Sequence, residues 1–169
     1  GTLALSGSNT LTNAATVTVD GGTLNLRNSS ALGDAAAVVN STLSITGTTL
    51  NIDNPITFNN GSSLVNNNAN GRNQFSGTVT LANDAAVTMN IAGSGNIFTL
   101  SGNTTGGNVN TTLTKSGTGL LDFASASDYL GTTILSAGSS RVSNDAGFGN
   151  STVQINTGAS LLLNGSNLD

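Results

Sequence analysis

The stretch LTKSGTGLLDFASASDYLGTTILSAGSSRV, residues 113–142, decides the fold. Short apolar positions alternate with small polar residues, and a glycine or an Asn/Asp turn follows each apolar group within a few positions. Apolar residues at every second position are typical of a strand with one buried face, whereas helices bury residues about three or four positions apart. The stretch therefore predicts short strands separated by tight turns, with no helix. The apolar residues expected to point inward are Leu113, Leu121, Phe123, Ile134 and Val142.

The composition extends this prediction to the rest of the chain. Of the 169 residues, 36% are hydrophobic and only 7% are charged. Disordered segments combine high charge with low hydrophobicity, so this balance favours an ordered protein. Asn, Thr, Ser and Gly supply most of the polarity, and these residues form turns or line strands, whereas Glu, Lys and Arg are absent or scarce. We therefore expect one all-β segment over residues 1–169, which belongs to a longer repeat array.

A regular recurrence of leucine suggests how the strands are arranged. Leu3, Leu24, Leu43 and Leu64 follow one another at intervals of 21, 19 and 21 positions, and Val87 comes 23 positions later. One coil of a parallel β-helix (β-solenoid) takes about 20 residues, so the chain predicts roughly eight coils. Leu, Val and Ile should then stack into a core, with ladders of Asn and Thr at the corners.

An antiparallel sandwich or barrel is the alternative, because its strands also recur every 8–12 residues or so. The turns lack a consistent two-residue hairpin signal, which favours the β-helix.

Several segments carry local expectations. The pairs expected to point inward outside residues 113–142 include Leu3/Leu5, Val17/Val19, Leu24/Leu26, Val153/Ile155 and Leu161/Leu163. Residues 34–39 are interpreted as a corner that enters a strand, with a short helix as the alternative. Pro55 lacks an N–H group and belongs at the start of a strand or at a turn. Residues 66–73 form the longest purely polar stretch, which predicts either a protruding loop or an asparagine-lined corner.

Residues 113–142 also carry a specific motif. Its members are Leu113, Lys115, Gly117, Gly119, Leu121, Tyr129, Gly131, Thr132, Thr133, Ile134, Ala137, Gly138 and Val142. Their spacing resembles the passenger-associated transport repeat of bacterial autotransporters, also called the autotransporter-associated β-strand repeat. In that family a Leu-x-Lys-x-Gly-x-Gly-x-Leu strand precedes an Asn-x-Tyr-x-Gly corner and a Thr-x-Val strand that ends in Ala-Gly-x-Leu. Asp128 stands where a corner Asn or Thr is usual, and Ser140 replaces an expected inward leucine.

The resemblance implies a large, exported, right-handed parallel β-helical passenger on, or shed from, the surface of a Gram-negative or related bacterium. Such passengers serve as adhesins, matrix components or scaffolds. An outer-membrane β-barrel in the full-length chain and surface glycans or proteins as partners are further implications. The low charge and the absence of cysteine suit a chain that crosses a narrow pore unfolded and then folds coil by coil.

The sequence offers little for catalysis or metal binding. It has no His and no Cys, and all eight acidic residues are aspartates, so it lacks the residues of a Ser-His dyad or a transition-metal cluster. Asp122 and Asp128 are the nearest candidate acid/base pair, and we expect both to be turn residues or residues of a solvated face, with Asp122 facing outward. The Gly-Gly-x-Gly-x-Asp repeat of calcium-binding β-rolls is missing. We therefore expect no enzyme, no catalytic residue, no cofactor and no metal.

The remaining conspicuous side chains have structural interpretations. Tyr129, the only tyrosine, is expected to pack at a corner rather than to stack on a sugar. Lys115 and Arg141 are expected to pair with Asp122 or Asp128 across adjacent coils, which contributes little at an exposed surface.

These features predict an extracellular structural or adhesive stalk segment, whose partners are neighbouring repeats or copies of itself end to end. The formal net charge of −4 argues against nucleic acid as a partner, because phosphate binding needs a basic surface. Two alternatives stay open. One is a subunit of an extracellular filament in which open coil edges add head to tail. The other is a non-catalytic part of a carbohydrate-active β-helix protein.

Overall fold

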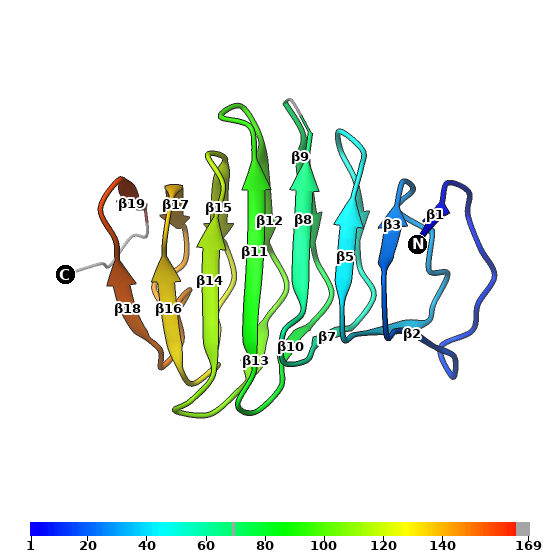
Figure 1. The fold of residues 1–169 in the computed structure, drawn as a ribbon, viewed down its shortest axis with the longest axis horizontal. Helices are drawn as coiled ribbons and strands as arrows, with labels where there is room; N and C mark the ends of the chain where they lie inside the picture. Colours follow the sequence, from blue (N-terminus) through cyan, green and yellow to red (C-terminus); the bar gives the residue numbers. More distant parts are fainter. Residues whose placement is uncertain (69, 165–169) are drawn as a thin grey trace.

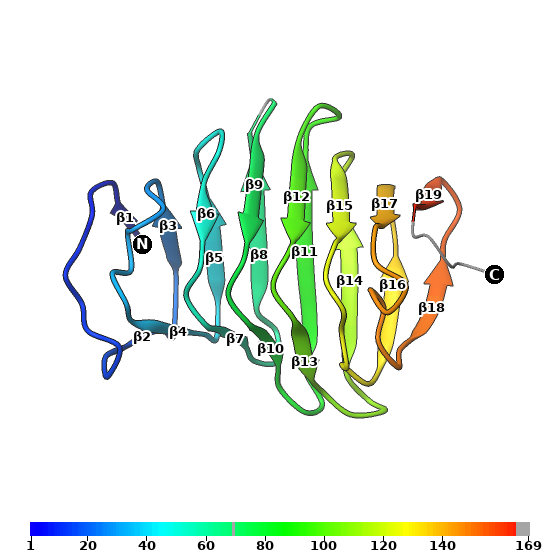
Figure 2. The ribbon, with the colours of Figure 1, turned by 180° about the vertical axis from the view of Figure 1, so that it is seen from behind.

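The computed structural model describes residues 1–68 and 70–164, and within these ranges it contains strands and turns but no helix. The strands form a parallel β-helix with three sheets, in which the chain visits sheet A, then sheet C, then sheet B in each complete coil (Figure 1). From the N-terminus at the right of Figure 1, the strands of sheet A run upward in front, and those of sheet C run downward in Figure 2, which views the molecule from behind. The helix is therefore right-handed, the hand of nearly all parallel crossovers.

The three sheets, A, B and C, differ in their number of strands, which is eight, five and six. Sheet A contains, in spatial order, β1 (Thr2–Leu5), β3 (Thr23–Leu26), β5 (Thr42–Ile45), β8 (Ser63–Asn67), β11 (Ala86–Ala92), β14 (Thr112–Ser116), β16 (Thr132–Leu135) and β18 (Thr152–Ile155). Sheet B contains β13 (Thr104–Gly106), β10 (Val79–Leu81), β7 (Ile56–Phe58), β4 (Ala36–Val39) and β2 (Thr16–Val19). Sheet C contains β19 (Ala159–Leu163), β17 (Gly138–Val142), β15 (Leu120–Phe123), β12 (Ile97–Leu100), β9 (Arg72–Phe75) and β6 (Asn51–Ile52).

Every strand pairing between the described strands is parallel, which excludes the antiparallel sandwich or barrel. The eight strands of sheet A confirm the expectation of about eight coils. In sheet A, Thr23 pairs with Thr42 of the next coil, 19 positions later, whereas Thr88 pairs with Thr114 of the next coil, 26 positions later. The expected period is thus confirmed as an average, with longer coils in the middle of the chain.

One step of the expected period is wrong. The partner of Leu64 in the next coil is Met89 and not Val87. The coil between them is longer because β8 and β9 contain more residues than β5 and β6. The chain from Leu81 to Met89 is also two positions longer than the corresponding chain from Phe58 to Leu64. Both Val87 and Met89 point inward and are fully buried, since they are two positions apart on one strand.

The core is a set of columns in which each inward side chain lies over its partner in the neighbouring coil. One column in sheet A contains Leu24, Leu43, Leu64, Met89, Lys115 and Leu135. One column in sheet C contains Ile52, Phe75, Leu100, Phe123 and Val142. The ring of Phe75 also lies 6.4 Å from that of Phe58 and 4.8 Å from that of Phe98, measured between ring centroids, so aromatic side chains fill the middle coils.

Several local expectations are confirmed. Residues 36–39 form β4, so the segment from Asp34 enters a strand and forms no helix. Pro55 directly precedes β7, where its missing N–H group costs no ladder hydrogen bond. The polar stretch at residues 66–73 includes position 69, which lies outside the described residues. On either side of it, Asn68 and Asn73 donate hydrogen bonds to Asn66, and Asn66 and Asn73 are buried, as expected for an asparagine-lined corner.

The pairs of inward-pointing apolar residues at the two ends of the β-helix are partly or largely exposed, contrary to expectation. Leu3 is 61% exposed and Leu163 is 60% exposed, and Ile155 is also exposed. These side chains occupy columns of the core, but a described coil covers them on one side only. The prediction that these side chains point toward the core is therefore right, but the expectation that they are buried is wrong.

Ile134 is a clear error of the sequence prediction. It is half-buried on the outer face of β16, whereas its neighbours Thr133 and Leu135 are fully buried. The register of β16 places Thr133 next to Leu113 and Leu135 next to Lys115, so alternation puts Ile134 outside.

Truncation of Phe75 should test the stacked core. We expect Phe75→Ala to lower the free energy of unfolding by about 3–5 kcal/mol, because it removes a fully buried ring between two coils. The matched control is Val109→Ala, at a side chain that is 74% exposed, which should change stability by no more than about 0.5 kcal/mol. Urea denaturation followed by circular dichroism measures both, and equal effects of the two substitutions would contradict the stacked core.

Candidate functional site

The most unusual side chain of the molecule is a buried lysine. Lys115 lies on β14 in a column of the core, between Met89 of the preceding coil and Leu135 of the following one, and it is fully buried. The expectation that it pairs with Asp122 or Asp128 at the surface is therefore wrong. Alternation from the inward Leu113 could have predicted this position, since residues two apart on a strand share a face.

Three backbone carbonyl groups surround the ammonium group of Lys115. Its Nζ donates hydrogen bonds to the oxygens of Gly117 and Gly119, both at 2.6 Å, and to that of Ala137 at 2.8 Å. Gly117 and Gly119 belong to the corner that follows β14, whereas Ala137 lies in the corresponding corner of the next coil. The lysine thus joins two successive coils from the inside.

Glycines make room for this arrangement. Gly117 has φ of +77° and Gly138 has φ of +65°, a conformation that L side chains rarely adopt. A Cβ atom at Gly138 would lie 2.8 Å from Nζ of Lys115, so a larger residue would displace the ammonium group. Lys115, Gly117 and Gly138 of the repeat motif therefore meet where the corners of two successive coils stack.

Burial lowers the pKa of Lys115 to about 8 from its usual 10.5. The side chain is therefore protonated in most molecules at neutral pH, where three N–H groups meet three carbonyl oxygens. Because hydrogen bonds from an ionised donor are stronger than those between neutral groups, the carbonyl groups offset part of the cost of burying the charge.

In the preceding coils, asparagines occupy the same side of the interior. The Nδ2 of Asn96 donates to the backbone oxygens of Ala92 and of Asn66, at 2.9 and 2.8 Å. The Oδ1 of Asn66 accepts hydrogen bonds from Asn68 and Asn73, at 2.8 and 3.0 Å. Asn66, Asn73 and Asn96 are all buried. Side-chain donors therefore satisfy interior carbonyl groups over successive coils between sheets A and C.

Asparagines also form a ladder at an outer corner. Asn40 donates to Asp20 of the preceding coil at 2.7 Å, and Asn59 donates to Asn40 at 2.5 Å. This confirms the expectation of stacked polar side chains at the corners.

Tyr129 packs in the interior as expected. It is buried, and its hydroxyl group lies 2.8 Å from the hydroxyl of Thr133, which in turn lies 2.9 Å from that of Ser151. This chain of hydroxyl groups explains how Thr133 occupies an inward position. Burial raises the pKa of the Tyr129 phenol above its usual 10.0. The ring offers no exposed face for stacking on a sugar.

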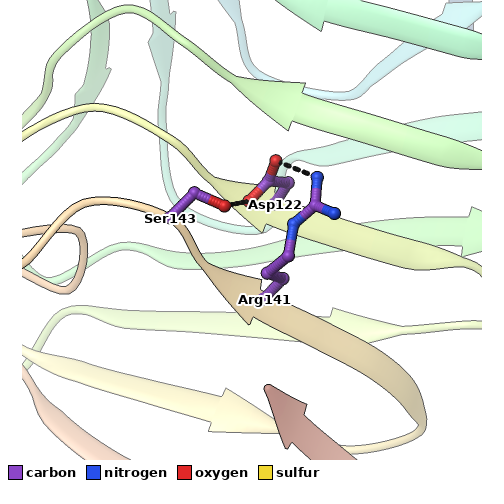
Figure 3. A network of polar contacts seen from close by, with 3 residues as sticks. All are labelled: Asp122, Arg141 and Ser143. Atoms are coloured by element: carbon purple, nitrogen blue, oxygen red, sulfur yellow. Dashed lines mark hydrogen bonds and ion pairs between the residues drawn. The ribbon is translucent and has the colours of Figure 1, made fainter. Parts of the chain in front are cut away.

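Asp122 forms the ion pair of sheet C (Figure 3). Its carboxylate accepts hydrogen bonds from the guanidinium group of Arg141, the next strand's partner in register, and from the hydroxyl of Ser143 at 2.8 Å. Pairing of Arg141 with Asp122 was expected and is confirmed. Asp122 faces away from Leu121 and Phe123, as expected. It is nevertheless buried against Arg141 and Ser143, so the expectation of a solvated carboxylate is wrong. Asp128 is exposed.

The remaining motif residues are structural in this arrangement. Leu113, Leu121 and Val142 are buried in the core, and Gly131 is also buried, whereas Thr132, Ala137 and Gly138 are half-buried. Ser140, which replaces an expected leucine, is buried between Leu121 and Leu161 of its column. Its hydroxyl oxygen has no hydrogen-bond partner in the described part of the chain.

Other features of the described residues give no further site. Within residues 1–68 and 70–164, no group of three His, Cys, Asp or Glu side chains could hold a metal ion. No helix long and apolar enough to cross a membrane occurs there either. A recess of about 450 Å³ opens at the first coil, where Leu3, Val17 and Leu24 line it together with Asp20.

Comparison of the chain with protein-family models, with curated proteins and with solved structures found no match.

Removal of the Asp122 carboxylate should destabilise the protein. We expect Asp122→Ala to lower the free energy of unfolding by about 1–3 kcal/mol, because it leaves the partly buried Arg141 and the Ser143 hydroxyl without their acceptor. Asp128→Ala serves as the control, since this residue is exposed and its loss should cost no more than about 0.5 kcal/mol. A similar loss for both variants in urea denaturation would show that the network contributes nothing specific.

Lys115 and Tyr129 should make stability depend on pH in opposite directions. Because the pKa of Lys115 is lowered to about 8 in the folded protein, the unfolded chain binds this proton more tightly between pH 8 and 10.5, and the free energy of unfolding rises with pH. Because the pKa of Tyr129 is raised above 10.0, the unfolded chain loses that proton first at higher pH, and the free energy of unfolding then falls.

We therefore expect maximal stability near pH 10, measured by urea denaturation from pH 7 to 11. Lys115→Met should abolish the rise between pH 8 and 10, and Tyr129→Phe should abolish the fall above it. A flat profile from pH 8 to 10 in the unmodified protein would contradict the assignment to Lys115.

Proposed function

We propose that the chain is a stalk segment of an extracellular, passenger-type surface protein, which holds an adhesive or partner-binding region away from the cell. The observation that carries the proposal is the continuous core, in which parallel coils stack from β1 to β18 without interruption. Eight coils at about 4.8 Å each give a rod of about 40 Å, and further coils of the same kind would extend it in the same direction.

The chemistry of the surface supports a role in spacing rather than in catalysis. The outward positions of sheet A carry Thr, Ser, Asn and a few apolar residues, and its one charged residue, Lys115, points inward. Such a face is polar enough to be soluble and presents no charge pattern that would select a particular ligand. The resemblance of residues 113–142 to the autotransporter repeat supports a bacterial surface location, with a β-barrel anchor and glycan or protein partners outside this segment.

A head-to-tail filament is the second candidate, and the exposed apolar side chains at the two ends favour it. Leu3 at one end and Ile155 and Leu163 at the other are exposed, and β1 and β18 have the same outward and inward alternation. A copy stacked on β18 through its own β1 would continue sheet A in register. Light scattering of the purified chain separates the candidates, because a filament subunit grows with concentration and a stalk segment stays monomeric.

Labelling of cells that produce the complete protein tests the surface location. The 169 residues contain no cysteine, so within them Val109→Cys introduces a single exposed thiol and Leu43→Cys a matched, fully buried one, and the protein without either substitution gives the background labelling. We expect a membrane-impermeant maleimide to label Val109→Cys on intact cells and to label Leu43→Cys only after denaturation. Labelling of Val109→Cys that requires cell lysis would refute the proposed location.

A further inference from the structure

The corner around Lys115 has the composition of a cation site. Three backbone oxygens, from Gly117, Gly119 and Ala137, converge on one point inside the molecule, within 2.6 to 2.8 Å of Nζ. The ion pair found in the described part of the chain joins Arg141 to Asp122, so no carboxylate balances the charge of Lys115 there. Instead, backbone carbonyl oxygens accept the hydrogen bonds of its ammonium group.

The neighbouring positions of the column show that a lysine is not needed to fill space. Met89 and Leu135, the partners of Lys115 in the adjacent coils, are apolar, fully buried and similar in length to the lysine stem. What sets this coil apart is its corner, where two glycine carbonyl groups turn inward. A buried carbonyl group without a donor is costly, so the corner needs a donor from within.

In the preceding coil the amide of Asn96 performs this function for two carbonyl groups. An amide nitrogen has two N–H donors, whereas an ammonium group has three, which equals the number of carbonyl groups at the Lys115 corner.

We propose that the three carbonyl groups form a binding site for a primary ammonium group, and that the ammonium of Lys115 is its built-in ligand, which fastens the coil of β14 to the coil of β16. The stabilisation comes from the three N–H donors, which satisfy three buried carbonyl oxygens, and the methylene stem acts as a tether. The site selects a cation with at least three N–H donors over a cation without donors, because only the former satisfies all three oxygens.

Removal of the tethered ligand makes the site accessible to a free one. Lys115→Ala leaves the three carbonyl groups beside a cavity the size of the missing side chain, and engineered cavities of this kind do bind small molecules that fit them. Methylammonium carries three N–H donors and a positive charge. Tetramethylammonium carries the same charge and no donor, so it is the matched control at equal ionic strength.

We expect Lys115→Ala to lower the melting temperature by something on the order of 5–10 °C. Methylammonium chloride should restore at least half of this loss, and the effect should saturate with concentration, as binding to the folded state requires. Tetramethylammonium chloride should restore none of it. Lys115→Met, which fills the cavity without a donor, should be destabilised as well and should not respond to either salt.

Two results would overturn the proposal. One is a Lys115→Met variant as stable as the unmodified protein, which would show that packing of the side-chain stem, and not the ammonium group, stabilises this corner. The other is an equal response of Lys115→Ala to methylammonium and tetramethylammonium, which would show an effect of salt and no binding.

A measurement on the unmodified protein covers the case in which Lys115→Ala does not fold. Lys115 is the only lysine among the four basic residues, so ¹⁵N-detected or ¹⁵N-edited NMR reports on a single lysine ammonium group. We expect its protons to exchange slowly enough with water to be visible at pH 7, with a nitrogen shift typical of the charged form. Absence of the signal at pH 7, in a sample whose backbone amides are visible, or a nitrogen shift typical of the neutral amine would refute a bound ammonium group.

Discussion

Each inward side chain lies over its partner in the neighbouring coil, and this one-to-one stacking is the constraint on which the rest of the structure depends. In the column from Leu24 to Leu135, five of the six positions are apolar, and Lys115 between Met89 and Leu135 is the exception. The hydrophobic effect therefore acts along the axis, coil upon coil, instead of around one central cluster. The uncovered ends of the columns explain why Leu3 and Leu163 are exposed.

The same constraint explains how polar groups enter the interior. A coil that returns to its starting sheet needs corners, and corners turn carbonyl groups toward the axis, where water is excluded. Asn73, Asn96 and Lys115 supply the missing donors, and hydroxyl groups from Tyr129 and Thr133 satisfy one another. The amides and hydroxyl groups are neutral, and the ammonium group of Lys115 is bound by backbone oxygens. None of them needs a buried ion of opposite charge. This agrees with a sequence in which only 7% of the residues are charged.

The alternation of apolar and polar residues predicted the strands, and the recurrence of leucine about every 20 positions predicted the parallel coils and their number. It could not predict which residue of an alternating pair points inward when both are plausible. At Thr133 and Ile134 the more apolar residue is outside, because the register with Leu113 and a set of hydroxyl partners decides the matter. The partners of Thr133 come from the corner before its strand and from the next coil, and a single sequence does not show these contacts.

Lys115 illustrates a different limit. Its position was predictable from alternation, but a charged residue is normally assigned to the surface because burying it is costly. What offsets the cost here is a ring of backbone oxygens, which depends on glycine conformations at Gly117 and Gly138. The repeat motif includes all three residues, yet only the three-dimensional arrangement shows that they meet where two successive corners stack.

The parallel ladders have a mechanical consequence. Hydrogen bonds between coils run along the axis of the rod, and each coil is joined only to its neighbours. Tension between the two ends would load these bonds one coil at a time, and each coil of about 20 residues would release about 70 Å of extended chain as it detached. Such a rod would unfold one coil at a time under force and lengthen with each step. The stepwise unfolding would dissipate the mechanical energy of a sudden pull.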